Sequence, residues 1–252
     1  MKKIINLSAL ILAVVLLLTS CSGITDRIFG PDYEKITNEI FTNYIEMNLL
    51  VETYSEGVTL GHQSQGSGVI YAKDSHYYYC LTNAHVIETA VTAKNISYTV
   101  TDCYGKQYKA TFVHADVSRD LAVLKFIASE SLCIAELAKF DPPVGEKVAV
   151  LSNSLHLINA VTYGEIFAYD TVTIMDEKGN DDTRVTFPVI WHDAPMWGGA
   201  SGSVLLNMDM ELVGINYAVG TNADGQFIRA YAVGVSKVRE YLEENDLLTP
   251  GR

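Results

Sequence analysis

Most of the chain shows the period-two alternation of β-strands rather than the spacing of helices. From residue 48 onward, short runs rich in Val, Ile, Tyr and Thr are separated by turns of Gly, Asp, Asn and Ser. β-Branched and aromatic residues suit a pleated surface, and turns at about this spacing are typical of antiparallel barrels and sandwiches. The pattern predicts strands over residues 48–54, 66–72, 76–82, 96–101, 107–115, 120–126, 147–152, 160–168, 184–192, 202–206, 211–217 and 227–233.

Two helices and one linker complete the predicted organisation. Apolar residues recur at three- and four-residue spacing between residues 33 and 45, which predicts a short helix after Pro31. The spacing of apolar residues over 236–245 predicts a capped C-terminal helix. The sequence DPPVG at 141–145 interrupts the strands near the middle of the chain. We therefore expect one all-β domain over residues 32–252, made of two antiparallel barrels at roughly 48–140 and 144–235.

The charged stretch at residues 176–182, with the sequence DEKGNDD, interrupts the second half. Its carboxylates could serve a calcium loop, but their spacing fits no known loop of that kind. We interpret the stretch as a solvated hairpin tip.

The first residues have the composition of a targeting segment. Lys2 and Lys3 precede an apolar run that ends at Leu18, too short for a membrane-spanning helix. The sequence LTSC at 18–21 resembles the lipobox of bacterial lipoproteins, which implies cleavage before Cys21 and its acylation. Residues 1–20 are thus predicted to be a lipoprotein signal peptide and residues 21–31 a tether, so that the domain works outside the cytoplasmic membrane; an ordinary secretory signal is the alternative.

The charge of the remaining chain excludes one class of partner. Without residues 1–20, 16 basic residues stand against 30 acidic ones, a net charge of −14. Such a surface argues against nucleic acid and against electrostatic docking on anionic lipid, so membrane attachment would come from the acyl chains on Cys21. Cys80, Cys103 and Cys133 have no CxxC spacing and are interpreted as small buried hydrophobes rather than a disulfide framework or zinc site.

One serine stands in a small-residue turn directly before an apolar strand. Residues 197–203 read WGGASGS and precede the run 204–206. A serine hydroxyl becomes a nucleophile only when a base takes its proton and N–H groups receive the oxyanion. On its own this stretch would be a hairpin turn, so the interpretation of Ser201 depends on a histidine and an aspartate elsewhere.

His85 and Asp120 are the matching candidates. His85 follows the predicted strand 76–82, so its ring can project into a cleft, and Asp120 begins the strand 120–126. A carboxylate buried there would need a donor, which an imidazole N–H supplies. We interpret the other five histidines as partly buried surface residues: His62, His76, His114, His156 and His192.

The order His85, Asp120, Ser201 is that of chymotrypsin-like serine proteases. Around these residues the chain resembles the HtrA/Deg family of bacterial serine proteases, from about residue 48 to residue 238. The resemblance implies a chymotrypsin-like double β-barrel. It is carried by GSGVI at 66–70, LTNAHV at 81–86, DLAVLK at 120–125, VGEKV at 144–148, DA at 193–194 and LVGIN at 212–216.

The resemblance also implies roles for individual residues. His85 would be the general base and later acid, Asp120 would orient its ring, and Ser201 would be the nucleophile. The N–H groups of Gly199 and Ser201 would form the oxyanion hole, and neither metal nor organic cofactor would be needed. The implied function is extracytoplasmic endoproteolysis of proteins or peptides, in a family that serves protein quality control and often forms trimers; the oligomeric state of this chain stays open.

Several positions depart from that family. It usually reads GNSGGP where this chain has GASGSV at 199–204. Ser203 resembles the glutamyl endopeptidases instead, which carry a histidine where this chain has Asn216. A glutamyl-endopeptidase-like secreted protease and a non-catalytic surface lipoprotein on a protease fold are therefore the alternatives, and Ala200 and Ser203 are the departures behind the second. No PDZ module follows the protease region before Arg252.

The substrate pocket can be outlined only by residue type. Trypsin-like specificity requires a carboxylate six residues before the nucleophile, where this chain has Pro195. We therefore expect an apolar or small residue before the scissile bond rather than Lys or Arg. The candidate pocket residues are Pro195, Met196, Trp197, Asn216 and Tyr217.

Overall fold

The computed structural model describes residues 31–56, 62–88, 94–154, 157–175 and 179–251. The predicted signal peptide, Cys21 and all of the predicted tether except Pro31 lie outside this part. No helix among the described residues is both long and apolar enough to span a membrane. The chain divides into two units, residues 1–38 and 39–252. Across that boundary the predicted N-terminal helix is present as α3 (Tyr33–Glu39), continued by a π-helical turn η1 (Ile40–Tyr44) and a 3-10 turn η2 (Ile45–Met47).

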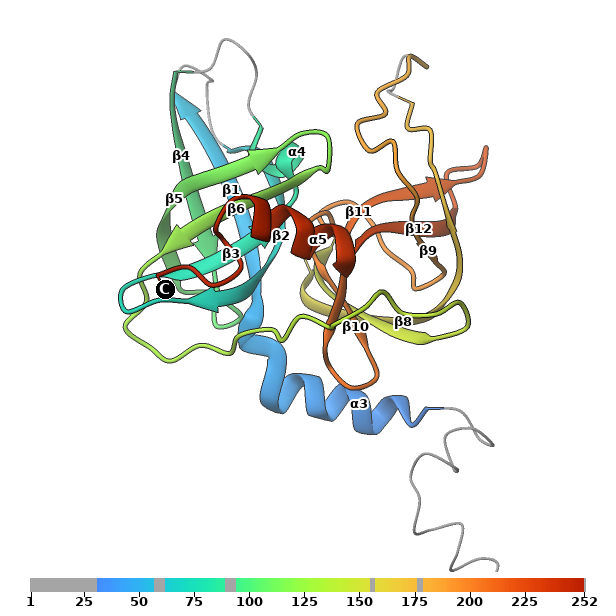
Figure 1. Ribbon diagram of the computed structural model, residues 1–252, viewed down its shortest axis with the longest axis horizontal. Helices are drawn as coiled ribbons and strands as arrows, with labels where there is room; N and C mark the ends of the chain where they lie inside the picture. The colour runs from blue at the N-terminus through green and yellow to red at the C-terminus, as the bar shows by residue number, and fades with distance from the viewer. Residues whose placement is uncertain (1–30, 57–61, 89–93, 155–156, 176–178, 252) are drawn as a thin grey trace, which may run out of the picture. The chain divides into compact units, whose positions relative to one another are not determined.

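Six strands of the second unit close into the first barrel (Figure 1). Their order around the barrel is β1-β2-β3-β6-β5-β4, and every pair is antiparallel. Closure leaves no unpaired edge, which short strands of this composition would otherwise expose. The strands are β1 (Asn48–Glu56), β2 (His62–Lys73), β3 (Tyr78–Thr82), β4 (Lys94–Thr101), β5 (Gln107–Asp116) and β6 (Leu121–Phe126).

The other six strands close into a second barrel of the same kind. Their order is β10-β11-β12-β9-β8-β7, again antiparallel throughout. The predicted all-β double barrel is thereby confirmed, and each predicted strand has its counterpart. The strands are β7 (Lys147–Ser154), β8 (Leu157–Asp170), β9 (Val189–His192), β10 (Val204–Asn207), β11 (Leu212–Thr221) and β12 (Phe227–Gly234).

Two predictions of detail need correction. The strand expected at 184–192 begins only at Val189, so residues 184–188 belong to a loop. The cysteines differ in burial: Cys80 is fully buried in β3 as predicted, whereas Cys103 and Cys133 are partly exposed free thiols. Both lie in connections, where no second layer of side chains covers them completely.

The C-terminal helix α5 (Val235–Glu244) joins the end of the second barrel to the first. Figure 1 shows it running from β12 back across the strands of the first barrel. Tyr241 is completely buried, and its hydroxyl donates to the carbonyl of His114 in β5 at 3.2 Å. Arg119 binds the carboxylates of Glu240 and Glu244. The helix therefore holds both barrels as one body.

The connection between the barrels is hydrogen-bonded to both of them. It runs from β6 to β7 and contains the predicted linker at 141–145. Ala135 N–H donates to the carbonyl of Ile70 in the first barrel at 2.8 Å, and Ala138 N–H donates to that of Leu212 in the second at 3.0 Å. These bonds limit the freedom of the barrels to separate.

Candidate active site

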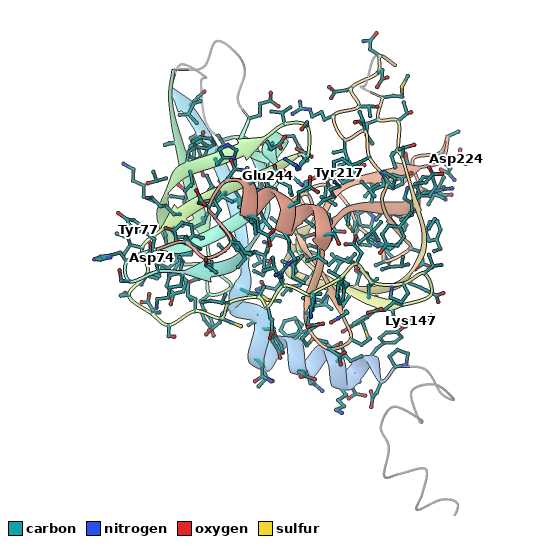
Figure 2. All side chains as sticks on the ribbon, in the orientation of Figure 1. Asp74, Tyr77, Lys147, Tyr217, Asp224 and Glu244 are labelled. Atoms are coloured by element: carbon teal, nitrogen blue, oxygen red, sulfur yellow. The ribbon has the colours of Figure 1, made fainter. Side chains whose placement is uncertain are left out.

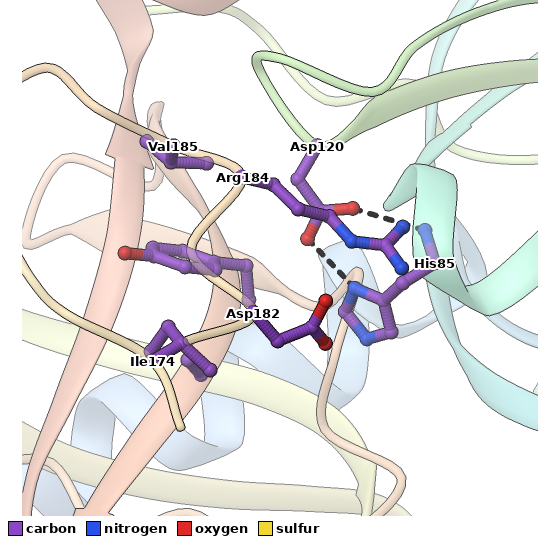
Figure 3. A pocket seen from close by; sticks show the side chains of 8 residues that line it. His85, Asp120, Ile174, Asp182, Arg184 and Val185 are labelled. Carbon is purple, nitrogen blue, oxygen red and sulfur yellow. Dashed lines mark hydrogen bonds and ion pairs between the residues drawn. The ribbon is translucent and has the colours of Figure 1, made fainter. Parts of the chain in front are cut away.

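The ends of two paired strands bring a histidine and an aspartate together. Thr82 of β3 pairs with Ala122 of β6, so the residues just beyond them lie at one end of the first barrel. There the helical turn α4 (Ala84–Ile87) carries His85, and Asp120 precedes β6. The ring Nδ1 of His85 donates to Asp120 Oδ2 at 2.7 Å, and its backbone N–H donates to Oδ1 at 2.9 Å (Figure 3). Both carboxylate oxygens are thus used on one histidine.

Asp120 is held in an unusual backbone conformation. Its φ is 51°, in the left-handed region that aspartate tolerates better than most residues but at a cost. The residue is only 3% exposed. The amide of Asn83 donates to its carbonyl at 2.8 Å, which fixes the strained peptide. Burying the carboxylate is offset by its two charge-assisted hydrogen bonds to His85.

The candidate nucleophile loop comes from the second barrel and is attached to the first through Ser67. The N–H of Ser67 donates to the carbonyl of Ser201 at 2.7 Å, and its hydroxyl donates to that of Gly199 at 2.8 Å. The same hydroxyl accepts the N–H of Asn153 of β7 at 2.8 Å. Ser67 is completely buried, so these bonds are protected from water.

Gly66 allows the loop to approach the histidine. A Cβ on this residue would lie 2.7 Å from a methyl group of Val86 and 2.9 Å from the carbonyl oxygen of Ser201. The backbone of Ser201 therefore lies close to the residue that follows His85. The hydroxyl of Ser201 donates to the carbonyl of Tyr217 at 3.4 Å, a long bond, and none of the hydrogen bonds among the described residues joins it to His85.

Some amides of this loop donate to another backbone group, whereas others have no hydrogen-bond acceptor among the described residues. Ala200 N–H donates to the carbonyl of Trp197 at 3.1 Å, and Gly202 N–H donates to that of Asn216 at 2.8 Å. The N–H groups of Gly199 and Ser201 donate to no group in the described part of the chain. These are the two donors that the sequence resemblance implies for an oxyanion hole.

One of the five predicted pocket residues lines a pocket beside His85. A pocket of about 210 Å³ lies beside His85, and of the five only Tyr217 lines it. Met196 and Asn216 are buried, whereas Trp197 is 45% exposed. Asp120, a predicted triad residue, also lines the pocket. The other lining residues were not predicted from the sequence to be part of a pocket: Ile174, Asp182, Arg184, Val185 and Ala218 (Figure 3).

Residues 176–178 of the charged stretch lie outside the described part of the chain, but its last residue, Asp182, has a position that the composition did not reveal. Asp182 is exposed, as expected of a hairpin tip, yet it also faces the pocket that contains His85. Figure 2 shows how many charged side chains cover the surface, so charge by itself could not have distinguished this one. Among the described residues, no group of three or more His, Cys, Asp or Glu side chains could hold a metal ion.

His192 is the clearest error of the sequence prediction. It is completely buried rather than on the surface, and its Nε2 bonds to Asn216 Oδ1 at 2.8 Å. Asn216 Nδ2 in turn donates to Ser203 Oγ at 3.0 Å. Burial lowers the pKa of His192 to about 4. The ring is therefore neutral near pH 7, so its Nε2–H donates, while its Nδ1 lacks a partner in the described part of the chain.

The remaining histidines are less informative. His76 is exposed and its Nδ1 lies 2.7 Å from Ser75 Oγ, whereas His114 is half-buried against Tyr241 as predicted. The side chains of His62 and His156 lie outside the described part of the chain.

Two six-stranded barrels with a histidine–aspartate pair on one and a glycine-rich serine loop on the other define the chymotrypsin-like class. The family model for the trypsin-like peptidase domain matches residues 66–215, and the chain belongs to that family.

Relatives of the HtrA type extend the similarity. The chain is 30% identical over 215 residues to a probable periplasmic serine endoprotease, DegP-like, of Halomonas elongata, which covers 85% of this chain and 42% of that protein. It is 33% identical to the serine endoprotease DegS of Haemophilus influenzae, over 79% and 52% of the two chains. With the serine protease Do-like HtrA of Bacillus subtilis the identity is 32%, over 74% and 40%. The chain thus spans about half the length of these relatives or less.

Replacing Gly202 of the serine loop by a residue with a side chain is expected to destabilise the protein. Its φ is 84°, and an added Cβ would lie 2.1 Å from the carbonyl oxygen of Ser67 and 2.3 Å from Thr82 Oγ1. Gly225 has a similar φ of 75° but open space around it. We expect Gly202→Ala to lower the free energy of unfolding by about 1–3 kcal/mol more than Gly225→Ala, because only the first adds a clash. Equal losses in urea unfolding would contradict this.

His192 is expected to make stability depend on pH. Because its folded pKa of about 4 lies below the ordinary 6.5, the unfolded chain takes up the proton first as the pH falls. The contribution of the neutral ring is complete above pH 6.5 and decreases toward pH 4, by up to about 3 kcal/mol. Urea unfolding of the wild type and His192→Gln at several pH values measures it. The variant should lose part of the pH dependence, and identical profiles would refute the prediction.

Proposed function

We propose that the chain is a serine endopeptidase in which His85, Asp120 and Ser201 form the catalytic triad. The observation that carries the proposal is the His85–Asp120 pair, in which a buried carboxylate binds both the ring and the backbone of one histidine. Such a contact fixes the tautomer of the ring and leaves Nε2 available as a base. The family membership and the relatives named as serine endoproteases support the same activity.

The reaction follows from these positions. The Ser201 hydroxyl leaves the carbonyl of Tyr217, gives its proton to His85 Nε2 and attacks the peptide carbonyl. The N–H groups of Gly199 and Ser201 receive the oxyanion. The tetrahedral intermediate collapses to an acyl-enzyme as His85 returns the proton to the leaving amine, and water then releases the acyl group by the same sequence.

The substrate proposal rests on what the predicted pocket residues can offer. None of the five is a carboxylate, and the amide of Asn216 is already bonded to His192 and Ser203. An apolar or small residue before the scissile bond therefore fits better than Arg or Lys. The neutral Asn216–His192 pair also offers no cation for a glutamyl substrate.

The proposed location is outside the cytoplasmic membrane, with Cys21 as the lipid anchor and proteins or peptides as substrates, in keeping with protein quality control. The predicted lipobox supports the anchor, and the similarity to a protein named as periplasmic supports the location.

The Ser201–Tyr217 contact favours a second candidate function. The Ser201 hydroxyl donates to the carbonyl of Tyr217 and not to His85, as it could in a surface binding module that keeps the protease fold without its activity. The two candidates differ in the reactivity of Ser201.

A fluorophosphonate probe is expected to label the wild type at Ser201. Ser201→Ala should abolish labelling and lower peptide hydrolysis by about 10³-fold or more, because no other nucleophile forms the acyl-enzyme. Ser75→Ala, in the exposed turn between β2 and β3 at the end of β3 opposite to His85, is the matched control and should behave as the wild type. Intact-protein mass spectrometry gives the readout. Comparable cleavage by Ser201→Ala, or no labelling of the wild type, would refute the proposal.

Peptides that differ only in the residue before the scissile bond test the specificity. We expect kcat/KM to be higher with Leu or Ala than with Arg or Glu, because the pocket residues offer neither a carboxylate nor a cation. Equal or faster turnover of the arginyl or glutamyl peptide would contradict the expectation.

A further inference from the structure

We infer that the pocket beside His85 is a subsite for a Lys or Arg side chain of the substrate, with Asp182 as its recognition group. The inference rests on the proposed function and extends it to a second position of the substrate. The pocket has a volume of about 210 Å³ and contains His85 itself, so whatever occupies it lies next to the reacting bond.

Hydrogen bonds fix the backbone on both sides of Asp182. In the connection between β8 and β9, Met175 forms an antiparallel bridge with Asp181. Asp182 N–H donates to the carbonyl of Ile174 at 2.8 Å, and Ile174 N–H donates to Thr183 Oγ1 at 2.9 Å. These bonds hold Ile174 and Asp182 side by side at the pocket, as Figure 3 shows.

Carboxylates outnumber cations at this pocket. Arg184 forms an ion pair with Glu88, which follows the helical turn of His85. The pKa of Arg184 is lowered by burial but raised on balance by Glu88, Asp120 and Asp182. Asp120 uses both oxygens on His85. The Asp182 carboxylate acts on Arg184 only through its charge and makes no ion pair or side-chain hydrogen bond among the described residues, so its oxygens are available to bind a ligand.

The other walls suit the stem of a long basic side chain. Ile174, Val185 and Ala218 supply methyl groups, and the buried Tyr217 adds its ring. Lys and Arg lay their aliphatic stems on such surfaces while the charged end stays at the rim. Asp182 is exposed and lies where that end would be.

One edge of β11 can accept an extended substrate beside the pocket. β11 pairs with β10 only as far as Ile215, whereas its pairing with β12 continues to Thr221. The other edge of residues 217–221 has no strand partner among the described residues. An extended peptide can add to such an edge. Because neighbouring side chains of a strand point to opposite faces, the residue preceding the one attacked by Ser201 would direct its side chain toward His85 and Asp182.

The test compares peptides that share Leu before the scissile bond and carry Lys, Met or Glu one position earlier. We expect the wild type to prefer Lys over Met in kcat/KM and to discriminate against Glu. Asp182→Asn should reduce the Lys-to-Met ratio by about two- to five-fold, as expected for a partly exposed ion pair. Added salt should reduce the ratio in the wild type as well.

Asp181→Asn is the matched control. It removes the same charge one residue away, from an exposed carboxylate that accepts the N–H of Thr183 at 2.9 Å and does not line the pocket. It should keep the wild-type ratio, and an equal loss in both variants would overturn the inference.

Two further results separate this inference from the proposed function. If Ser201 reacts with the fluorophosphonate but Lys, Met and Glu peptides are cleaved alike, or Glu is preferred, the subsite is wrong and the endopeptidase stands. If the wild type neither reacts nor hydrolyses any peptide, both fail together.

Discussion

The hydroxyl and amide of Ser67 join the two halves of the candidate active site. One buried residue of β2 binds the carbonyls of Gly199 and Ser201 and accepts the N–H of Asn153. An apolar residue at position 67 would leave the carbonyl of Gly199 and the N–H of Asn153 unsatisfied in a dry interface, at a cost of about 1–3 kcal/mol per group, because only the hydroxyl binds them. The position of the serine loop relative to His85 therefore depends on this contact.

Two other buried polar arrangements give the site its rigidity. The strained conformation of Asp120 persists because the Asn83 side chain binds its carbonyl and His85 binds both of its carboxylate oxygens. On the opposite side of the serine loop, the neutral ring of His192 orients Asn216, which binds Ser203. Ser203, which departs from the HtrA pattern, and Asn216, which belongs to it, thus lie in one hydrogen-bonded network.

The sequence predicted the strands well because each barrel is built from local alternation that ends at recognisable turns. Its largest error of this kind was residues 184–188, which form a loop rather than a strand and contribute Arg184 and Val185 to the pocket. The resemblance marked His85, Asp120 and Ser201, and the structure places the first two in contact. His192 was misjudged because a single histidine carries no local signal of its burial.

The sequence alone indicated the two sets of strands, the helices at both ends and three candidate triad residues of a serine protease. These depend on patterns within short windows and on motifs of fixed order. Only the tertiary structure decided that Ser67 holds the serine loop, that His192 supports Asn216, and that Asp182 faces the pocket of His85. The hydrogen bonds among these contacts join residues from 24 positions apart, in His192–Asn216, to more than 130, in Ser67–Gly199, and their energies depend on burial and geometry that no local window contains.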